Sequence, residues 1–180
     1  MRRTVLLVTC VALLVTACGG GSRTTTYSDP NAPVTFAYPS DFTNGFADTG
    51  SEFAGRPPTF RTAVGVNSSN VVVISTYTIK KAYESYGGVT AFQPIVDSAA
   101  RAIARAAKTQ VTKIGHEKLG PLDGYTYDLD PGDGSGDGER LIFAFRGTTE
   151  YFERCTWFAA QAEAVKKACQ QVQATLKLKQ

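Results

Sequence analysis

The sequence predicts an α+β fold, in which a largely antiparallel sheet is packed by two main helices. Runs with the alternating polar and apolar pattern of strands recur along the chain, and two longer segments carry apolar residues at helical spacing. Neighbouring strands are joined by short turns, as in hairpins, and each of the two helices follows a group of strands. This grouping indicates an α/β sandwich whose helices cover an antiparallel sheet.

The strands are predicted from alternation and from the turn residues between them. Asn67 to Ser69 and Gly147-Thr148 are expected to turn two hairpins. Residues 39–53 and 130–138 are rich in turn-forming residues and predict longer connections. Val71 to Ile74 is apolar on both faces, which predicts a central strand covered on both sides. The expected strands are 33–38, 59–66, 70–80, 111–118, 125–129, 141–146 and 149–158.

Two amphipathic helices are predicted. Thr90 is expected to cap the first, because its hydroxyl can accept a hydrogen bond from a free amide of the first turn. Arg101, Arg105 and Lys108 fall largely on the other side of this helix and predict a solvated face. The apolar stripe of the first helix contains Phe92, Val96, Ala99 and Ile103. The stripe of the second helix, over 160–177, contains Ala162, Val165, Cys169, Val172 and Leu176.

The amino-terminal segment is predicted to be a secretory signal. Met1-Arg2-Arg3 is positively charged, and Thr4 to Val15 is uncharged and mostly apolar. This run is shorter than the stretch of about 20 apolar residues that a membrane-spanning helix needs. A positive start, a short apolar run and small residues before a cleavage site are together typical of exported proteins.

The end of this run, Leu14-Val15-Thr16-Ala17-Cys18, resembles the lipobox of bacterial lipoproteins. The resemblance implies that a diacylglycerol is attached to Cys18 through a thioether and that signal peptidase II then cuts before this residue. Two or more acyl chains would hold the protein stably on the extracytoplasmic side of the cell membrane. The alternative is an ordinary signal peptide with a cysteine at the cut by chance.

Length and charge fit one globular domain behind the signal. The chain has 180 residues, of which 43% are hydrophobic and 19% charged. Without Arg2 and Arg3, 17 of the 19 basic side chains remain beside 16 acidic ones, so the charge does not favour nucleic acid as a partner. The expected organisation is a signal peptide over 1–17, a flexible tether rich in Gly, Ser, Thr and Pro over 18–33, and a single domain over 34–180.

Cys155 and Cys169 are predicted to form a disulfide in an oxidising compartment. They are the two that remain when Cys10 leaves with the signal and Cys18 takes the lipid. If the chain reverses near Ala159, Cys155 lies about 13 Å back along a strand. Cys169 then lies about 13 Å forward along a helix, at the same height. A bridge would add about 3 kcal/mol of stability. A redox or metal pair is the alternative, but there is no CxxC and no histidine nearby.

The sequence holds no recognisable catalytic constellation, so an enzyme is not expected. A hydrolase triad needs a histidine beside its nucleophile, but His116 is the only histidine and no serine lies in a GxSxG motif. Neither a phosphate loop nor a dinucleotide fingerprint is present, so no cofactor is expected. The acids between Asp128 and Glu139 partly match a calcium loop, but Ala144 stands where the bidentate glutamate is needed, so no metal site is expected.

Eight aromatic residues come from the late strands and the residue after them. They predict either core packing under the helices or the lining of a groove for an apolar ligand or another protein. These residues are Tyr125, Tyr127, Phe143, Phe145, Tyr151, Phe152, Trp157 and Phe158.

Two short segments and the order of elements resemble the PsbP-like fold, which actinobacterial lipoproteins of the LpqN type share. The segments are Tyr38-Pro39-Ser40-Asp41-Phe42 and Tyr151-Phe152-Glu153-Arg154-Cys155 before a final helix, and the resemblance covers about Val34 to Leu178. It implies a non-catalytic protein-binding or scaffolding module, with a protein partner in the cell envelope. The alternative is a carrier or sensor of a lipid or other apolar small molecule. A flat exposed apolar patch would favour the first, and an open groove lined by aromatics the second.

Overall fold

The computed structural model describes residues 23–46, 53 and 56–179. The predicted signal peptide and Cys18 lie outside these residues. The strands are β1 (Thr24–Tyr27), β2 (Val34–Pro39), β3 (Thr43–Asn44), β4 (Phe60–Asn67), β5 (Asn70–Thr78), β6 (Gln110–Leu119), β7 (Leu122–Asp130), β8 (Gly138–Arg146), β9 (Thr149–Trp157) and β10 (Lys177–Leu178). The α-helices are α1 (Val89–Ala107) and α2 (Ala162–Thr175), and the short 3₁₀ helices are η1 (Tyr83–Tyr86) and η2 (Ala159–Gln161).

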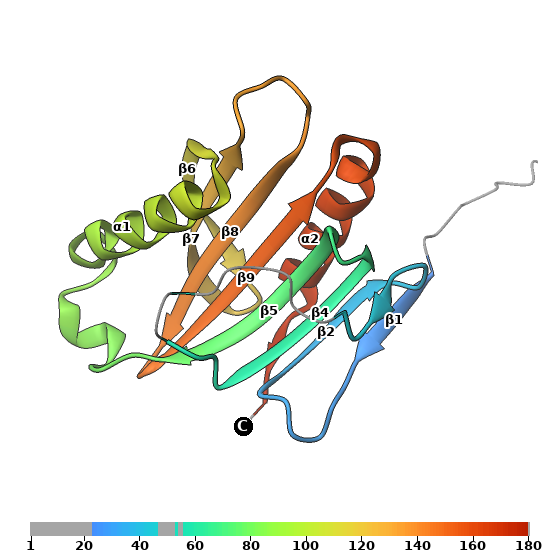
Figure 1. Cartoon of the computed structure of the whole chain (residues 1–180). Helices are drawn as coiled ribbons and strands as arrows, with labels where there is room; N and C mark the ends of the chain where they lie inside the picture. Colours follow the sequence, from blue (N-terminus) through green and yellow to red (C-terminus); the bar gives the residue numbers. More distant parts are fainter. Residues whose placement is uncertain (1–22, 47–52, 54–55, 180) are drawn as a thin grey trace, which may run out of the picture.

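Seven strands form one sheet in the order β3-β4-β5-β9-β8-β7-β6, and every neighbouring pair is antiparallel. A smaller sheet has the order β1-β2-β10. Helix α1 covers one face of the large sheet, and α2 together with the small sheet covers the other (Figure 1). The fold is therefore the α+β sandwich that the sequence predicts, with two cores separated by the large sheet.

Strand β5 confirms the expectation of a central strand covered on both sides. All its residues from Asn70 to Tyr77 are buried. Val72 and Ile74 point to the core under α2, whereas Tyr77 points to the core under α1. This is the packing that a run of apolar residues without alternation indicates.

The eight aromatic residues of the late strands divide between the two faces of the sheet. Alternate residues of a strand point to opposite faces, so neighbours such as Tyr151 and Phe152 enter different cores. Tyr125, Tyr127, Phe143, Phe145 and Phe152 lie under α1. Tyr151 and Trp157 lie under α2, and Phe158 is exposed. Seven of these residues are therefore buried in a core, and the face under α1 is the richer in aromatic rings.

The disulfide between Cys155 and Cys169 is present, and their Cα atoms are 6.1 Å apart. It joins β9 to α2, as the matched heights on strand and helix predict. The helix is shorter than expected, because η2 precedes it and the chain leaves helical conformation at Leu176. The following residues, Lys177–Leu178, pair with β2 instead.

The flexible tether expected over 18–33 is wrong from Thr24 onward. Strand β1 pairs with β2, the Tyr27 ring stacks on that of Phe36 at 4.9 Å between centroids, and Ala32 is buried. The sequence Thr24-Thr25-Thr26-Tyr27 consists of residues that favour strands, and the neighbouring strand offers free backbone groups to pair with. The folded domain therefore begins about ten residues before Val34, where the composition suggested a coil.

Helix α1 does not begin as expected. Its N-cap is Gly88, with φ of 91°, and the exposed Thr90 lies inside the first turn. The amide of Phe92 donates to the Gly88 carbonyl, so the helix begins two residues earlier than a cap at Thr90 allows. The rest of the helix follows the prediction: its basic residues are exposed and Phe92, Val96 and Ile103 are buried. Over 23–46 and 56–179, no helix has the length and hydropathy of a membrane span.

Candidate functional site

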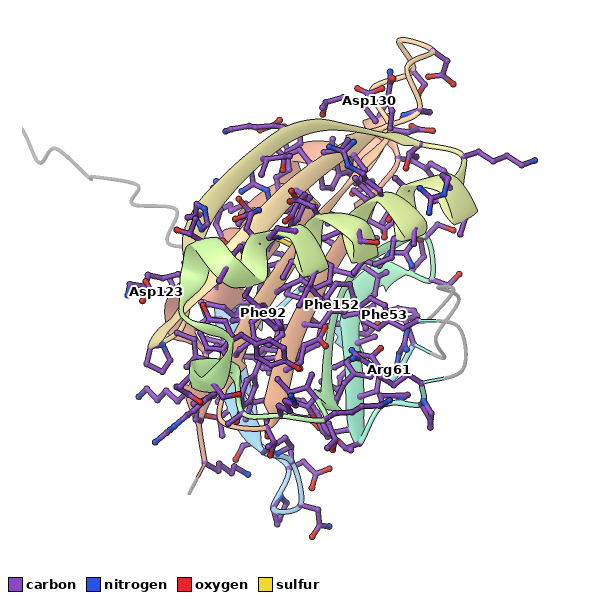
Figure 2. All side chains as sticks on the ribbon, turned by 90° about the vertical axis from the view of Figure 1, so that its left-hand side faces the viewer. Phe53, Arg61, Phe92, Asp123, Asp130 and Phe152 are labelled. Atoms are coloured by element: carbon purple, nitrogen blue, oxygen red, sulfur yellow. A yellow bond between two sulfur atoms is a disulfide. The ribbon has the colours of Figure 1, made fainter. Side chains whose placement is uncertain are left out.

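The candidate site is a groove of about 570 Å³ between α1 and the end of the large sheet. This volume lies within the range of roughly 300–1,000 Å³ that small-molecule sites have. Figure 2 shows Phe92 below α1, with Phe152 and Phe53 following it across the sheet. The residues lining the groove are Phe53, Arg56, Thr78, Ile79, Lys80, Tyr86, Phe92, Ile95, Val96, Ala99, Phe143, Phe145 and Glu150.

Aromatic rings make up the floor and one end of the groove. Phe145 and Phe92 meet edge to face, with their centroids 4.8 Å apart, and Tyr86 packs on Phe92 at 4.7 Å. Phe53 meets the rings of Tyr77 and Phe152 at 5.0 and 5.3 Å. These edge-to-face contacts hold the rings in defined positions, so the apolar surface is largely preformed.

One apolar side chain of the groove wall remains in contact with solvent. Ile95 on α1 is 50% exposed, although Val96 beside it is buried in the core. Ile95 belongs to the lining of the groove, where a ligand would cover it.

An ion pair lies at the sheet end of this apolar surface. The Arg56 guanidinium donates to the Glu150 carboxylate, and its Cζ atom lies 4.8 Å from the ring centroids of both Phe53 and Tyr77. The Glu150 side chain is 4% exposed, whereas that of Arg56 is 37% exposed. Burial raises the pKa of Glu150, and the nearby positive charge of Arg56 opposes that rise. The pair therefore presents its cation, not its anion, toward the solvent side.

Hydrogen bonds between hydroxyl groups and helix residues fix the elements that roof the groove. The Tyr127 hydroxyl donates to Asp97 Oδ1 at 2.7 Å and accepts from Gln93 Nε2 at 2.9 Å. The hydroxyls of Tyr83 and Tyr125 share a hydrogen bond of 2.9 Å. Burial raises the pKa of Tyr127 well above its ordinary value, and the bond to Asp97 adds to the effect. Tyr127 stays protonated, and the three tyrosines serve as anchors of α1 and η1.

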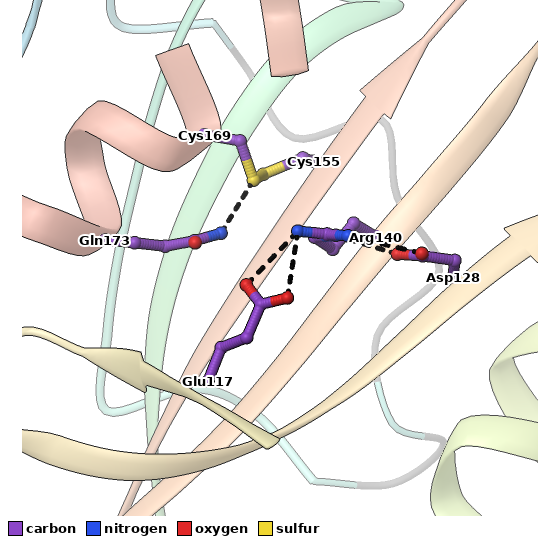
Figure 3. Close-up of a disulfide and its surroundings, with 6 residues drawn as sticks. All are labelled: Glu117, Asp128, Arg140, Cys155, Cys169 and Gln173. Atoms are coloured by element: carbon purple, nitrogen blue, oxygen red, sulfur yellow. Dashed lines mark hydrogen bonds and ion pairs between the residues drawn. A yellow bond between two sulfur atoms is a disulfide. The ribbon is translucent and has the colours of Figure 1, made fainter. Parts of the chain in front are cut away.

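A second cavity, of about 430 Å³, lies on the opposite face of the sheet beside the disulfide, and its charged groups are engaged with one another. Arg140 donates to Asp128 at 2.7 Å and pairs with Glu117 at 3.2 Å (Figure 3). Asp137 accepts a hydrogen bond from the backbone amide of Ala159. Arg140, Asp128 and Asp137 thus have partners within the fold.

Glu153 is the most deeply buried acid of this face. Burial raises its pKa to about 8, which Gln173 and Arg140 only partly offset. One of its carboxylate oxygens lies within 4.8 Å of the sulfur atoms of Cys155 and Cys169. Both sulfurs belong to the disulfide, so neither is available as a thiolate ligand in this state.

The residues weighed for chemistry in the sequence do not meet at one place. His116 is exposed on β6 and packs against Tyr125, with ring centroids 5.2 Å apart. The acidic loop is shorter than the stretch Asp128 to Glu139, because both of these end residues lie in strands. There they pair with arginines of neighbouring strands, at Arg140 and Arg154. Within the loop, Asp130 and Asp133 each accept a hydrogen bond from a backbone amide two residues on.

Sequence reasoning missed the residues at the charged end of the groove. Arg56 lies between the predicted connection over 39–53 and the predicted strand over 59–66, and Lys80 is the last residue of the strand predicted over 70–80. Glu150 gave the one usable signal: it is an acid within a strand, followed by Tyr151 and Phe152, and a buried acid needs a cationic partner. The pattern could not name that partner, because Arg56 is 94 residues away in the chain.

The comparisons with known proteins bear on the fold alone. No protein-family model matches the sequence, and no curated protein matches it. The solution structure of cyanobacterial PsbP (CyanoP) from Synechocystis sp. PCC 6803 superposes with a TM-score of 0.58 at 13% identity, over 92% of this chain and 99% of that chain. The fold is PsbP-like. A crystal structure from Bacteroides thetaiotaomicron VPI-5482 has a TM-score of 0.48 at 17% identity, over 86% of this chain and 48% of that chain.

The match to CyanoP covers nearly the whole of both chains. It confirms the fold class that the sequence predicts. At 13% identity the likeness carries no site residue from one protein to the other. The function of this chain has to be argued from its own groove.

Proposed function

We propose that this protein is a lipoprotein of the LpqN type, held at the extracytoplasmic face of the cell membrane, whose PsbP-like domain binds an apolar small molecule in the groove beneath α1. The proposal has two supports. The lipobox ending at Cys18 supports the anchor. The groove, with five aromatic side chains in its lining and a half-exposed Ile95 on its wall, supports the ligand.

The groove is the observation that favours a carrier or sensor over a scaffold. A protein-binding surface is expected to be a broad exposed apolar patch. In the described part of the chain, the large apolar side chains that are exposed come from four separate segments: Val66, Ile95, Ile114 and Phe158. Val66 lies on β4 and Ile114 on the far edge strand β6, so they do not adjoin. Concave apolar surface is therefore better represented than flat apolar surface, and a protein partner is the second candidate.

The anchor is tested by Cys18→Ala. We expect the variant to accumulate as uncut precursor and to incorporate no labelled fatty acid, because the acceptor thiol is gone. Cell fractionation followed by mass spectrometry of the intact chain reads both effects. Equal incorporation of fatty acid by the variant contradicts the anchor.

The groove is tested with a neutral photoactivatable probe, a twelve-carbon alcohol that carries a diazirine near the end of its chain. The full-length protein, as its host processes it, is placed in nanodiscs of zwitterionic lipid and illuminated, and the labelled peptides are mapped. We expect labels on α1, β8 and β9. Ala99→Trp fills the groove and removes them, while Ala102→Trp, at an exposed position of the same helix, leaves them unchanged. Labelling that ignores Ala99→Trp contradicts the proposed site.

A further inference from the structure

The charges around the groove are unequal. Its lining contains two cations, Arg56 and Lys80, and one anion, Glu150. The anion is almost completely buried beneath its partner, whereas Lys80 is exposed and the Arg56 side chain is 37% exposed. A ligand entering the groove therefore meets positive charge on an otherwise apolar surface.

Arg56 has N–H donors that its bond to Glu150 does not use. A guanidinium carries five N–H donors, and the bond to Glu150 uses the terminal nitrogen Nη2. Its Nε atom is buried and has no hydrogen-bond partner among the described residues. A buried donor without a partner is costly, and an acceptor from a ligand would satisfy it.

Arg56 is also held in place before any ligand arrives. The rings of Phe53 and Tyr77 flank its guanidinium, and Glu150 binds one end of that group. A cation held in this way loses little rotational freedom when it binds an anion. Guanidinium groups match the geometry of carboxylates and phosphates, which can accept two parallel hydrogen bonds.

We infer that the groove takes an anionic amphiphile, with its acidic head beside Arg56 and Lys80 and its aliphatic chain against Phe92, Ile95 and Ala99. This inference rests on the proposed function and adds the class of ligand. The head-group chemistry shared by the possible sources is a carboxylate or phosphate, and Glu150 acts as the positioning residue for Arg56.

The experiment compares four photoactivatable probes with the same twelve-carbon chain: a carboxylic acid, a phosphate monoester, an alcohol and an amine. The full-length protein in zwitterionic nanodiscs is labelled with each, and groove peptides are quantified by mass spectrometry. We expect the anionic probes to label the groove about tenfold more than the alcohol, and the amine to label it least. The ratio of acid to phosphate identifies which head group is preferred.

The decisive variant is Arg56→Gln combined with Glu150→Gln, which removes both charges and leaves no buried acid without its partner. Labelling by the anionic probes should fall to the level that the alcohol reaches in the same variant. Lys80→Gln should lower anionic labelling a few-fold, and Lys81→Gln, at the next exposed residue outside the groove, should not. Circular dichroism confirms that each variant is folded.

The outcomes separate this inference from the proposed function. If all four probes label the groove equally, or if the double variant loses alcohol and acid alike, selectivity for anions is wrong although the groove binds aliphatic chains. If no probe labels the groove in the unaltered protein, the proposed binding function itself is wrong.

Discussion

The two faces of the large sheet are closed in different ways. The face under α2 carries a disulfide, a second small sheet and ion pairs that satisfy one another. The face under α1 is covered by one helix, which hydrogen bonds of Gln93 and Asp97 attach to Tyr127, and it leaves an open groove beside that helix. The comparison shows one face closed by a covalent link and ion pairs, and another that keeps apolar surface accessible in a groove.

The largest expected effect comes from removing the covalent link on the α2 face. Cys155→Ala combined with Cys169→Ala should lower the free energy of unfolding by about 3 kcal/mol, because the unfolded chain regains the freedom of a loop closed over 14 residues. Urea denaturation followed by circular dichroism measures this loss. If the two faces are independent, probe labelling of the groove in the folded variant is unchanged. Loss of labelling in a variant that stays folded would show that the disulfide face also supports binding in the groove, and would contradict the independence of the two faces.

The second effect concerns Glu153, whose pKa burial raises to about 8. The folded chain keeps this proton up to about pH 8, whereas the unfolded chain releases it near the ordinary value of 4.5. The folded state therefore binds more protons between these values, so stability from this group is fully present below pH 4.5 and is lost as the pH rises to about 8. Glu153→Gln should remove this pH dependence and stabilise the protein at pH 9, since each unit of pKa shift corresponds to about 1.4 kcal/mol.

The control for this prediction is Glu163→Gln, since Glu163 lies on α2 and its side chain is 97% exposed. Thermal unfolding between pH 5 and pH 9 should show the same slope for this control and for the unaltered protein. A Glu153→Gln variant that keeps the slope would show that Glu153 is not the group that titrates.

A smaller effect is expected on the α1 face. Tyr127→Phe removes the hydroxyl that bonds to Asp97 and Gln93, and it should cost about 1–2 kcal/mol of stability. A double-mutant cycle with Asp97→Asn separates the coupling from the effect of each residue alone. Coupling near zero would mean that the hydroxyl does not attach α1 to the sheet, and the roof of the groove would then need another anchor.

The last prediction is that calcium does not change the stability of the protein through the acidic loop between β7 and β8. Asp130 and Asp133 already accept backbone amides in the loop, and Asp137 accepts the amide of Ala159. We expect the melting temperature to be the same with and without millimolar calcium. A saturable rise that Asp133→Ala abolishes would overturn this prediction and would add a ligand site far from the groove.

Most of the fold could be predicted because the spacing of apolar residues within each strand or helix identifies that element locally. The central position of β5 followed from an apolar run, and the disulfide from the strand and helix spacings around Ala159. Strand β1 could not be predicted in this way. Its composition also suits a coil, and its pairing with β2 depends on an edge that exists only once β2 is in place.

The candidate site was the least predictable part. Aromatic residues such as Phe143 and Phe145 pointed to the right strands, but the sequence alone could not choose between core and groove. The choice depends on how far α1 covers the sheet. The pair of Arg56 and Glu150 joins a connection to a strand across most of the chain, and no local pattern encodes such a contact.

Strand β1 has a consequence for where the protein can act. If Cys18 carries the lipid as proposed, six residues lead from it to Thr24, and a fully extended chain of that length reaches about 20 Å. The tether expected from composition, up to Val34, would have reached about 50 Å. The shorter linker would then keep the domain close to the bilayer surface. Its search for a ligand is then a two-dimensional one over the surface of its own membrane, and the molecules it meets most often are those leaving or entering that leaflet.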